Sequence, residues 1–143
     1  MIERWRESEV AQVPTNPPPA LLLPKNVQSP RAARAFAHSV VEDEAPGACA
    51  DHLDTVALVV SELVTNAVRY GSRPGDDVQI VVDADMSRTR VEVIDRTRRR
   101  PRRRRTAPED TRGRGLLLLD ALTDRWGFVV RPTGKAVWAE VQR

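Results

Sequence analysis

The sequence predicts an α+β domain in which a mixed β-sheet carries its helices on one face. Two long segments, 29–44 and 51–70, repeat apolar residues with the period of a helix. Two others, 78–85 and 89–95, alternate apolar and polar residues as half-buried strands do. The predicted order is strand, helix, helix, strand, strand, loop, helix, strand, strand. The chain has 143 residues, which is enough for one domain with a core.

The first 19 residues are expected to form a flexible tail, and the domain is expected to span 20–143. The tail contains "VPTNPPPA", which is rich in proline and has no apolar period. The run "ALLLP" that follows, 20–24, is short and apolar and ends in proline. It is therefore predicted to be an edge strand.

Two helices should follow this strand. The segment "SPRAARAFAHSVVEDE", 29–44, has Ser29 as its expected N-cap and Pro30 in its first turn. The second helix is expected over 51–70, with Gly71 as its C-terminal stop.

The second half of the chain is predicted to begin with the strands 78–85 and 89–95, joined by a short turn. A long loop should then span 96–112, because no apolar period is present there. The segment "GRGLLLLDALTDRWG", 113–127, predicts a third helix that closes on its last glycine. The final segment "FVVRPTGKAVWAEV", 128–141, predicts a β-hairpin.

The composition indicates a cytoplasmic protein. A single cysteine, Cys49, excludes an internal disulfide and suits a reducing compartment. No apolar run approaches the roughly 20 residues of a membrane helix, and no signal peptide is visible. The two histidines, His38 and His52, stand alone, so they predict no zinc site and are expected on helix surfaces.

Positive charge is concentrated in one segment, 96–114. It holds ten arginines against two carboxylates, a local +8, so the rest of the chain carries −5 within the total of +3. The plain interpretation is a solvated loop; the alternatives are shielding of phosphates or docking of an acidic partner. Nucleic-acid binding is the weakest alternative, because no groove-reading helix or stacking surface accompanies the arginines.

The segment "SELVTNAVRYG", 61–71, places Glu62 and Asn66 four residues apart in an apolar helix, on nearly the same face. A buried carboxylate is costly unless a charged or hydrogen-bonding group meets it. Asn66 offers a neutral oxygen to Mg²⁺, which takes few protein ligands. Glu62 can accept a proton from an attacking hydroxyl.

Three further residues extend this pattern toward a nucleotide site. Asp95 ends a strand just before the long loop, and it can accept a hydrogen bond from an exocyclic amine such as that of adenine. Gly113 and Gly115 open a helix just after the loop, where backbone N–H groups bind phosphate. Taken singly these signals are weak, because polar helix surfaces and glycines at helix starts are common.

These motifs together resemble the GHKL ATPase superfamily, which has the Bergerat fold. "SELVTNAVRYG" is similar to its N box, "VEVIDRT" to its first glycine box, "GRGLLLLDALTDRWG" to its second and "GKAVWAEV" to its closing strand. The resemblance covers about Leu21 to Val141. Within the superfamily the chain resembles the small stand-alone anti-sigma-factor serine kinases of actinobacteria.

The resemblance implies a role for each candidate residue. Glu62 would be the catalytic base, Asn66 would coordinate Mg²⁺ on the phosphates of ATP, and Asp95 would bind the adenine amine. The residues that would cradle the phosphates beneath a lid at 96–112 are Gly113, Arg114 and Gly115.

The implied activity is that of an ATP-dependent serine/threonine protein kinase acting on an anti-anti-sigma (STAS) protein, with a sigma factor as a further partner. Relatives are commonly homodimers. Two departures from the family pattern leave an alternative open. The segment Arg96–Arg99 lacks the glycines of the first glycine box, and Ala136 stands where a threonine is usual. The alternative is a non-catalytic module of the same fold that binds a partner.

Overall fold

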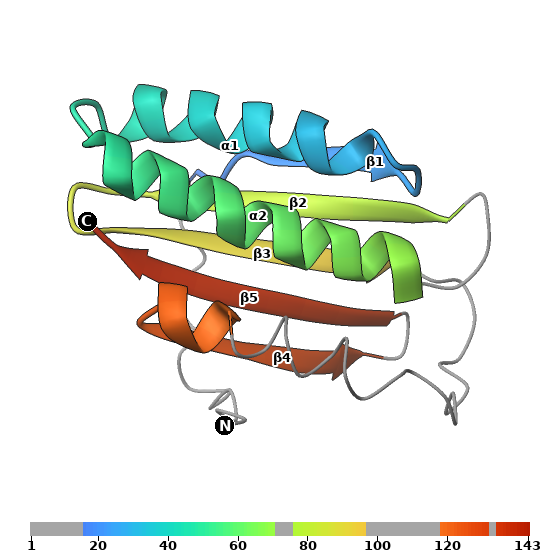
Figure 1. Ribbon diagram of the computed structural model, residues 1–143. Coiled ribbons are helices and arrows are strands. Elements are labelled where there is room, and N and C mark those ends of the chain that lie inside the picture. The colour runs from blue at the N-terminus through green and yellow to red at the C-terminus, as the bar shows by residue number, and fades with distance from the viewer. Residues whose placement is uncertain (1–15, 71–75, 97–117, 132–133) are drawn as a thin grey trace.

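The computed structural model describes residues 16–70, 76–96, 118–131 and 134–143, which form a five-stranded sheet with helices on one face (Figure 1). The elements are β1 (Ala20–Pro24), α1 (Ser29–Glu44), α2 (Ala50–Tyr70), β2 (Asp77–Ala84), β3 (Arg88–Arg96), β4 (Arg125–Arg131) and β5 (Gly134–Gln142). The strand order is β1-β2-β3-β5-β4, and residues 118–122 are helical. The predicted α+β class, with helices on one face of a sheet, is confirmed.

All pairings between the described strands are antiparallel, so the expectation of a mixed sheet is wrong. Two helices connect β1 to β2 and return the chain to the end of the sheet that it left, so β2 runs opposite to β1. β3 and β4 run in the same direction, but β5 lies between them. β3 and β4 are therefore not neighbours, and their common direction gives no parallel pair.

The chain joins the sheet just before β1. The predicted tail spans 1–19, and its residues 1–15 lie outside the described part of the chain. Within the described part, the carbonyl of Pro19 accepts a hydrogen bond of 3.0 Å from the N–H of Val82. Backbone contact with β2 thus begins one residue before β1 itself.

The turn between β1 and α1 is closed by its own side chains. Helix α1 has the predicted bounds, but Ser29 is its first residue and not its N-cap, which is Gln28. The Ser29 hydroxyl donates instead to the carbonyl of Pro24. The carboxamide oxygen of Asn26 accepts a hydrogen bond of 3.0 Å from the Gln28 N–H. Ser29 therefore fastens the turn to the end of the edge strand.

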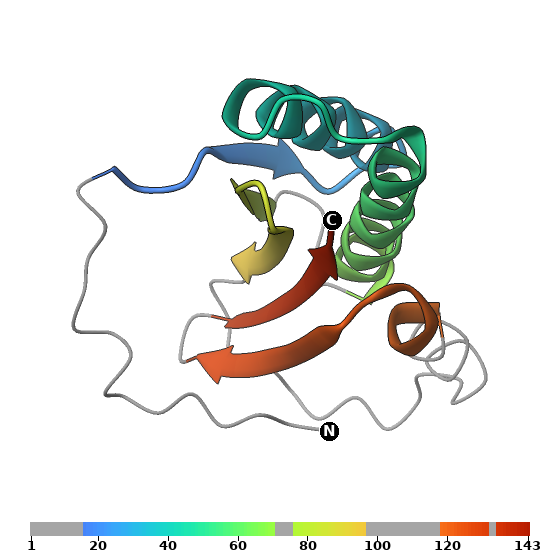
Figure 2. The same ribbon diagram turned by 90° about the vertical axis from the view of Figure 1, so that its left-hand side faces the viewer.

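Figure 2 shows α1 and α2 lying on one side of the sheet, and the core residues belong to these two layers. The core is built largely from valines, whose branched side chains pack well on a pleated surface. Its fully buried members include Val56, Val59, Val60, Val64, Val78, Ile80, Val82, Val91 and Leu119. Among the described helices, none is long and apolar enough to cross a membrane.

His52 is buried, and the expectation that it lies on a helix surface is wrong. Its Nδ1 lies 3.1 Å from the carbonyl oxygen of Gln142, and its Nε2 lies 2.9 Å from the Thr89 hydroxyl. A carbonyl only accepts, so Nδ1 is the donor in the first contact, and the Thr89 hydroxyl can pair with Nε2 in the second. His52 thereby ties α2 to β3 and β5. His38 is exposed as predicted, with Nε2 3.0 Å from Glu42.

Replacing His52 with alanine should lower the free energy of unfolding by about 1–3 kcal/mol, because the buried Thr89 hydroxyl loses its partner. Urea denaturation followed by circular dichroism measures this. The matched control is His38→Ala, which removes an exposed imidazole and should change stability by less than about 0.5 kcal/mol. Equal effects of the two substitutions would show that the His52 contacts contribute nothing specific.

The third predicted helix ends earlier than expected. The N–H of Asp124 already donates to the carbonyl of Glu140, and β4 begins at Arg125. Gly127, predicted to stop the helix, lies inside β4 opposite Trp138. A Cβ at Gly127 would lie 3.0 Å from the Trp138 ring. The glycine is therefore required by an aromatic side chain of the next strand.

Candidate functional site

Asp95 lies at the end of β3 and faces the helices. It shares this face with the core residues Val91 and Val93, because residues two apart on a strand point the same way. Its neighbours across the sheet are Val78 of β2 and Lys135 of β5. Only 4% of Asp95 is exposed. A carboxylate so buried requires a charged or hydrogen-bonding partner.

Lys25, in the turn between β1 and α1, is that partner. Its Nζ lies 2.6 Å from Oδ1 of Asp95, and the two side chains are 4% and 5% exposed. The distance suits a charge-assisted hydrogen bond, but the angles do not. Neither atom makes an acceptable hydrogen bond with any residue that the structure describes. We therefore treat the contact as an ion pair, held by charge and burial.

Glu62 and Asn66 are half-buried side chains on one flank of α2. Each immediately precedes a residue of the buried stripe, Leu63 and Ala67 respectively. The opposite flank faces α1, since Ser61 accepts a hydrogen bond of 2.8 Å from Arg34. The two polar side chains thus lie beside the core stripe, on the side of α2 away from α1.

The C-terminal end of α2 lies at the end of the sheet where β2 begins (Figure 1), and Asp95 of β3 is paired there with Val78 of β2. α2 ends at Tyr70, and β2 begins at Asp77, whose partner across the sheet is Arg96. Asn66 is about one helical turn from the end of α2. The fold therefore brings together the elements that carry three of the predicted site residues, which the sequence separates by about thirty positions.

Ala136, which stands where the family pattern has a threonine, is not beside Asp95. Its partner on β3 is Ile94, whereas Asp95 is paired with Lys135. Neighbouring residues on a strand point to opposite faces of a sheet. Ala136 therefore lies on the face away from the helices, and Lys135 holds the position next to Asp95.

The remaining predicted site residues lie outside the described part of the chain. These are Gly113, Arg114 and Gly115, together with the lid at 96–112 except for Arg96. Arg96 ends β3 and is exposed. The described geometry thus covers the residues predicted to contact the adenine, Mg²⁺ and the attacking hydroxyl. It does not cover the residues predicted to hold the phosphates.

Lys25 is the residue at this site that sequence reasoning missed. It follows the proline that ends an edge strand, where a lysine is ordinarily a solvated surface residue. No local pattern connects it with an aspartate about seventy positions later. Only the alignment of β1, β2 and β3 makes the pair.

The donor set fits an adenine nucleotide with magnesium. Oδ1 of Asp95 is a buried acceptor without a well-aligned donor among the described residues. The Asn66 carboxamide oxygen can serve as one ligand of Mg²⁺. No group of three or more His, Cys, Asp or Glu side chains in the described ranges is placed to hold a metal. Phosphate and water oxygens are the further ligands that Mg²⁺ ordinarily uses beside one or two protein groups.

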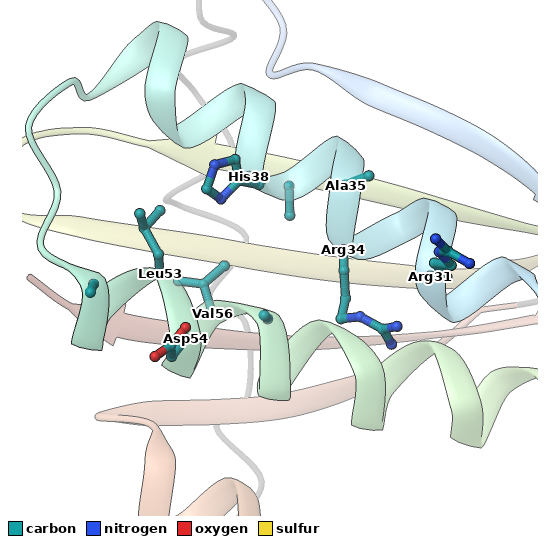
Figure 3. Close-up of a pocket in the computed structure, with 10 residues that line it drawn as sticks. Arg31, Arg34, Ala35, His38, Leu53, Asp54 and Val56 are labelled. Carbon is teal, nitrogen blue, oxygen red and sulfur yellow. The ribbon is translucent and has the colours of Figure 1, made fainter.

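A groove of about 460 Å³ lies elsewhere, between α1 and α2 (Figure 3). Arg31 and Arg34 line it from α1, and Leu53 and Asp54 line it from α2. None of the predicted site residues is among its lining residues. The groove is therefore a feature of the outer helix surface, distinct from the Asp95 end of the sheet.

The comparisons agree with the motifs. A family model described as a histidine kinase-like ATPase domain matches residues 23–141. The comparison with curated proteins gives no match. The matched segment begins within β1 and ends within β5, and it includes Glu62, Asn66 and Asp95.

Proposed function

The chain belongs to the histidine kinase-like ATPase domain family, and on that premise we propose that it is an ATP-dependent serine/threonine kinase that phosphorylates an anti-anti-sigma (STAS) protein. Family membership supports an ATP-binding regulatory function. The observation that carries the proposal is the buried Asp95 at the end of the sheet, with Glu62 and Asn66 on the helix that ends there. A sigma factor is the further partner in this proposal.

Each residue has one task in the proposed reaction. Asp95 accepts a hydrogen bond from the adenine amine, and Asn66 gives one oxygen to Mg²⁺. Gly113, Arg114 and Gly115 hold the phosphates. Glu62 takes the proton of the partner's hydroxyl as its oxygen bonds to the γ-phosphorus and the bond to ADP breaks. Catalysis of this kind rests mainly on positioning and charge stabilisation.

A binding module without kinase activity is the second candidate. Two observations favour it. The segment Arg96–Arg99 lacks the glycines that would let the backbone approach a nucleotide closely. Asp95 is already paired with Lys25. In this case the fold would hold a partner through the same surfaces, and the chain would transfer no phosphate.

Replacing Asp95 with asparagine should weaken ATP binding by roughly ten-fold or more, because the amide can present a donor to the adenine amine. Isothermal titration calorimetry with Mg²⁺-ATP and Mg²⁺-GTP measures this. The substitution also removes the counter-ion of Lys25, so a thermal melt must first show that the variant is folded.

The matched control is Asp83→Asn, at the other end of β2, which should leave ATP affinity unchanged. The unaltered chain should prefer ATP to GTP. If it binds the two equally well, Asp95 does not read the base. If it binds neither at millimolar concentration, the nucleotide function itself is wrong.

A further inference from the structure

We propose that Lys25 is a competing cation: it covers the base-binding oxygen of Asp95 and must leave it before adenine binds. Lys25 would then set both the affinity for nucleotide and the dependence on the exocyclic amine. This inference rests on the proposed role of Asp95 in ATP binding, and it adds a residue that the family motifs do not include.

The first support is steric. Nζ of Lys25 lies 2.6 Å from Oδ1 of Asp95, and neither atom has exposed surface. An amine that donates to a carboxylate must come within about 3 Å of the oxygen. The ammonium group takes one donor position at Oδ1, and Oδ1 itself is buried. A ligand amine therefore reaches this oxygen only after the groups that cover it, Lys25 among them, have moved.

The second support is the quality of the contact. The two charges attract, but the angles leave Nζ and Oδ1 without a proper hydrogen bond to any described residue. A buried ion pair has little net stability once the cost of desolvation is counted. An adenine amine aligned with the carboxylate would form the directed bond that the lysine does not. The exchange is thus a competition between the ammonium group and the adenine amine for the same oxygen.

Lys25 lies in a turn whose backbone is held by hydrogen bonds. The N–H of Asn26 donates to the Pro24 carbonyl at 3.1 Å, and the N–H of Ser29 donates to the Asn26 carbonyl at 3.2 Å. These bonds hold the backbone of the turn, while the four-carbon lysine stem has bonds about which the ammonium group can rotate away from Asp95. Asn26 and Val27, the next two residues, are exposed. Water is therefore within reach of the displaced ammonium after rotation of the side chain alone.

The sign of the predicted effect is unusual. Removing a cation near a binding site ordinarily weakens the binding of an anion such as ATP. If Lys25 competes for Asp95, its removal should strengthen ATP binding, because the apparent affinity is reduced by the fraction of molecules in which the site is covered. General electrostatics and competition thus predict opposite results for the same substitution.

The test compares the unaltered chain with Lys25→Met, which keeps the apolar stem and removes the charge. Calorimetric titration with Mg²⁺-ATP should show binding tighter by about ten-fold or more. The triphosphate of purine riboside, which lacks the exocyclic amine, should bind both proteins alike. Arg88→Met, at the far end of β3, is the control for net charge and should change neither affinity.

Two more variants keep the test decisive. Lys25→Gln is neutral but can still donate to Asp95, so it serves if Lys25→Met does not fold, and it should also bind ATP more tightly. In the Asp95→Asn background, Lys25→Met should give no gain, because the two residues act through one contact.

Unchanged or weaker ATP binding by folded Lys25 variants would overturn the proposal. An equal gain for the amine-free nucleotide would do so too, since the effect would then not involve Asp95 and the amine. If neither the unaltered chain nor any variant binds ATP, the nucleotide function fails and this inference fails with it. That result can be told apart from the outcome in which ATP binds but the Lys25 substitutions leave its affinity unchanged.

Discussion

Glu62→Gln should lower phosphate transfer to a serine-bearing STAS partner by about two to four orders of magnitude, while ATP affinity persists. Glutamine keeps the shape of glutamate, but its carboxamide cannot act as the base that takes the proton of the hydroxyl. Glu62 is half-buried beside the core stripe of α2, so the substitution should disturb packing little. The two effects are measured together, by calorimetry with Mg²⁺-ATP and by transfer of labelled phosphate.

The matched control for Glu62 is Glu44→Gln, at the exposed end of α1, which should retain full transfer. Undiminished transfer by Glu62→Gln would exclude Glu62 as the base. An unaltered chain that binds the partner and ATP but transfers nothing would favour the binding module. A change in melting temperature without any effect on nucleotide or transfer would make Glu62 a structural residue only.

Asn66→Ala should abolish the Mg²⁺ dependence of ATP binding, or binding altogether. Asn66 is the protein ligand proposed for the ion, so its loss should leave a weak affinity that is the same in Mg²⁺ and in a chelator. When Mg²⁺ is removed, the affinity of the unaltered chain for ATP should fall roughly ten-fold or more, because the charge of the phosphates is then no longer offset by the ion. Alanine is a better helix former than asparagine, so α2 should remain intact.

Thr65→Ala is the control for Asn66. Thr65 is the adjacent residue of α2 and is also half-buried, but it points about 100° away around the helix. It should keep the normal response to Mg²⁺. Retention of that response by Asn66→Ala would place the metal ligand elsewhere in the chain.

Local pattern was a reliable guide where the helix or strand buries one continuous stripe. The bounds of α1 match the prediction at both ends, and α2 begins one residue before its predicted start. β3 keeps the predicted alternation along its whole length, and β2 keeps it as far as Asp83. In these segments the spacing of apolar residues along the sequence directly identifies the side chains that face the core.

Local pattern failed where a residue found its partner outside its own helix or strand. Ser29 was expected to cap its own helix, but its hydroxyl binds the carbonyl of Pro24 in the preceding strand. Gly127 was expected to end a helix, but it makes room for Trp138 of β5. His52 was expected on the surface, but it is buried and contacts Thr89 of β3 and Gln142 of β5. In each case a contact with another element outweighed a local preference.

The sequence by itself determined the α+β class and the two long helices. It also nominated Glu62, Asn66 and Asp95 for the candidate site from their motifs, and these assignments stay predictions. Only the tertiary structure decided what stands next to Asp95. The pairing of β1, β2 and β3 brings Lys25 within 2.6 Å of it, and the register of β5 turns Lys135 toward it and Ala136 away. A one-residue change of register would reverse that choice. Register depends on contacts between strands distant in sequence, and no local pattern encodes it.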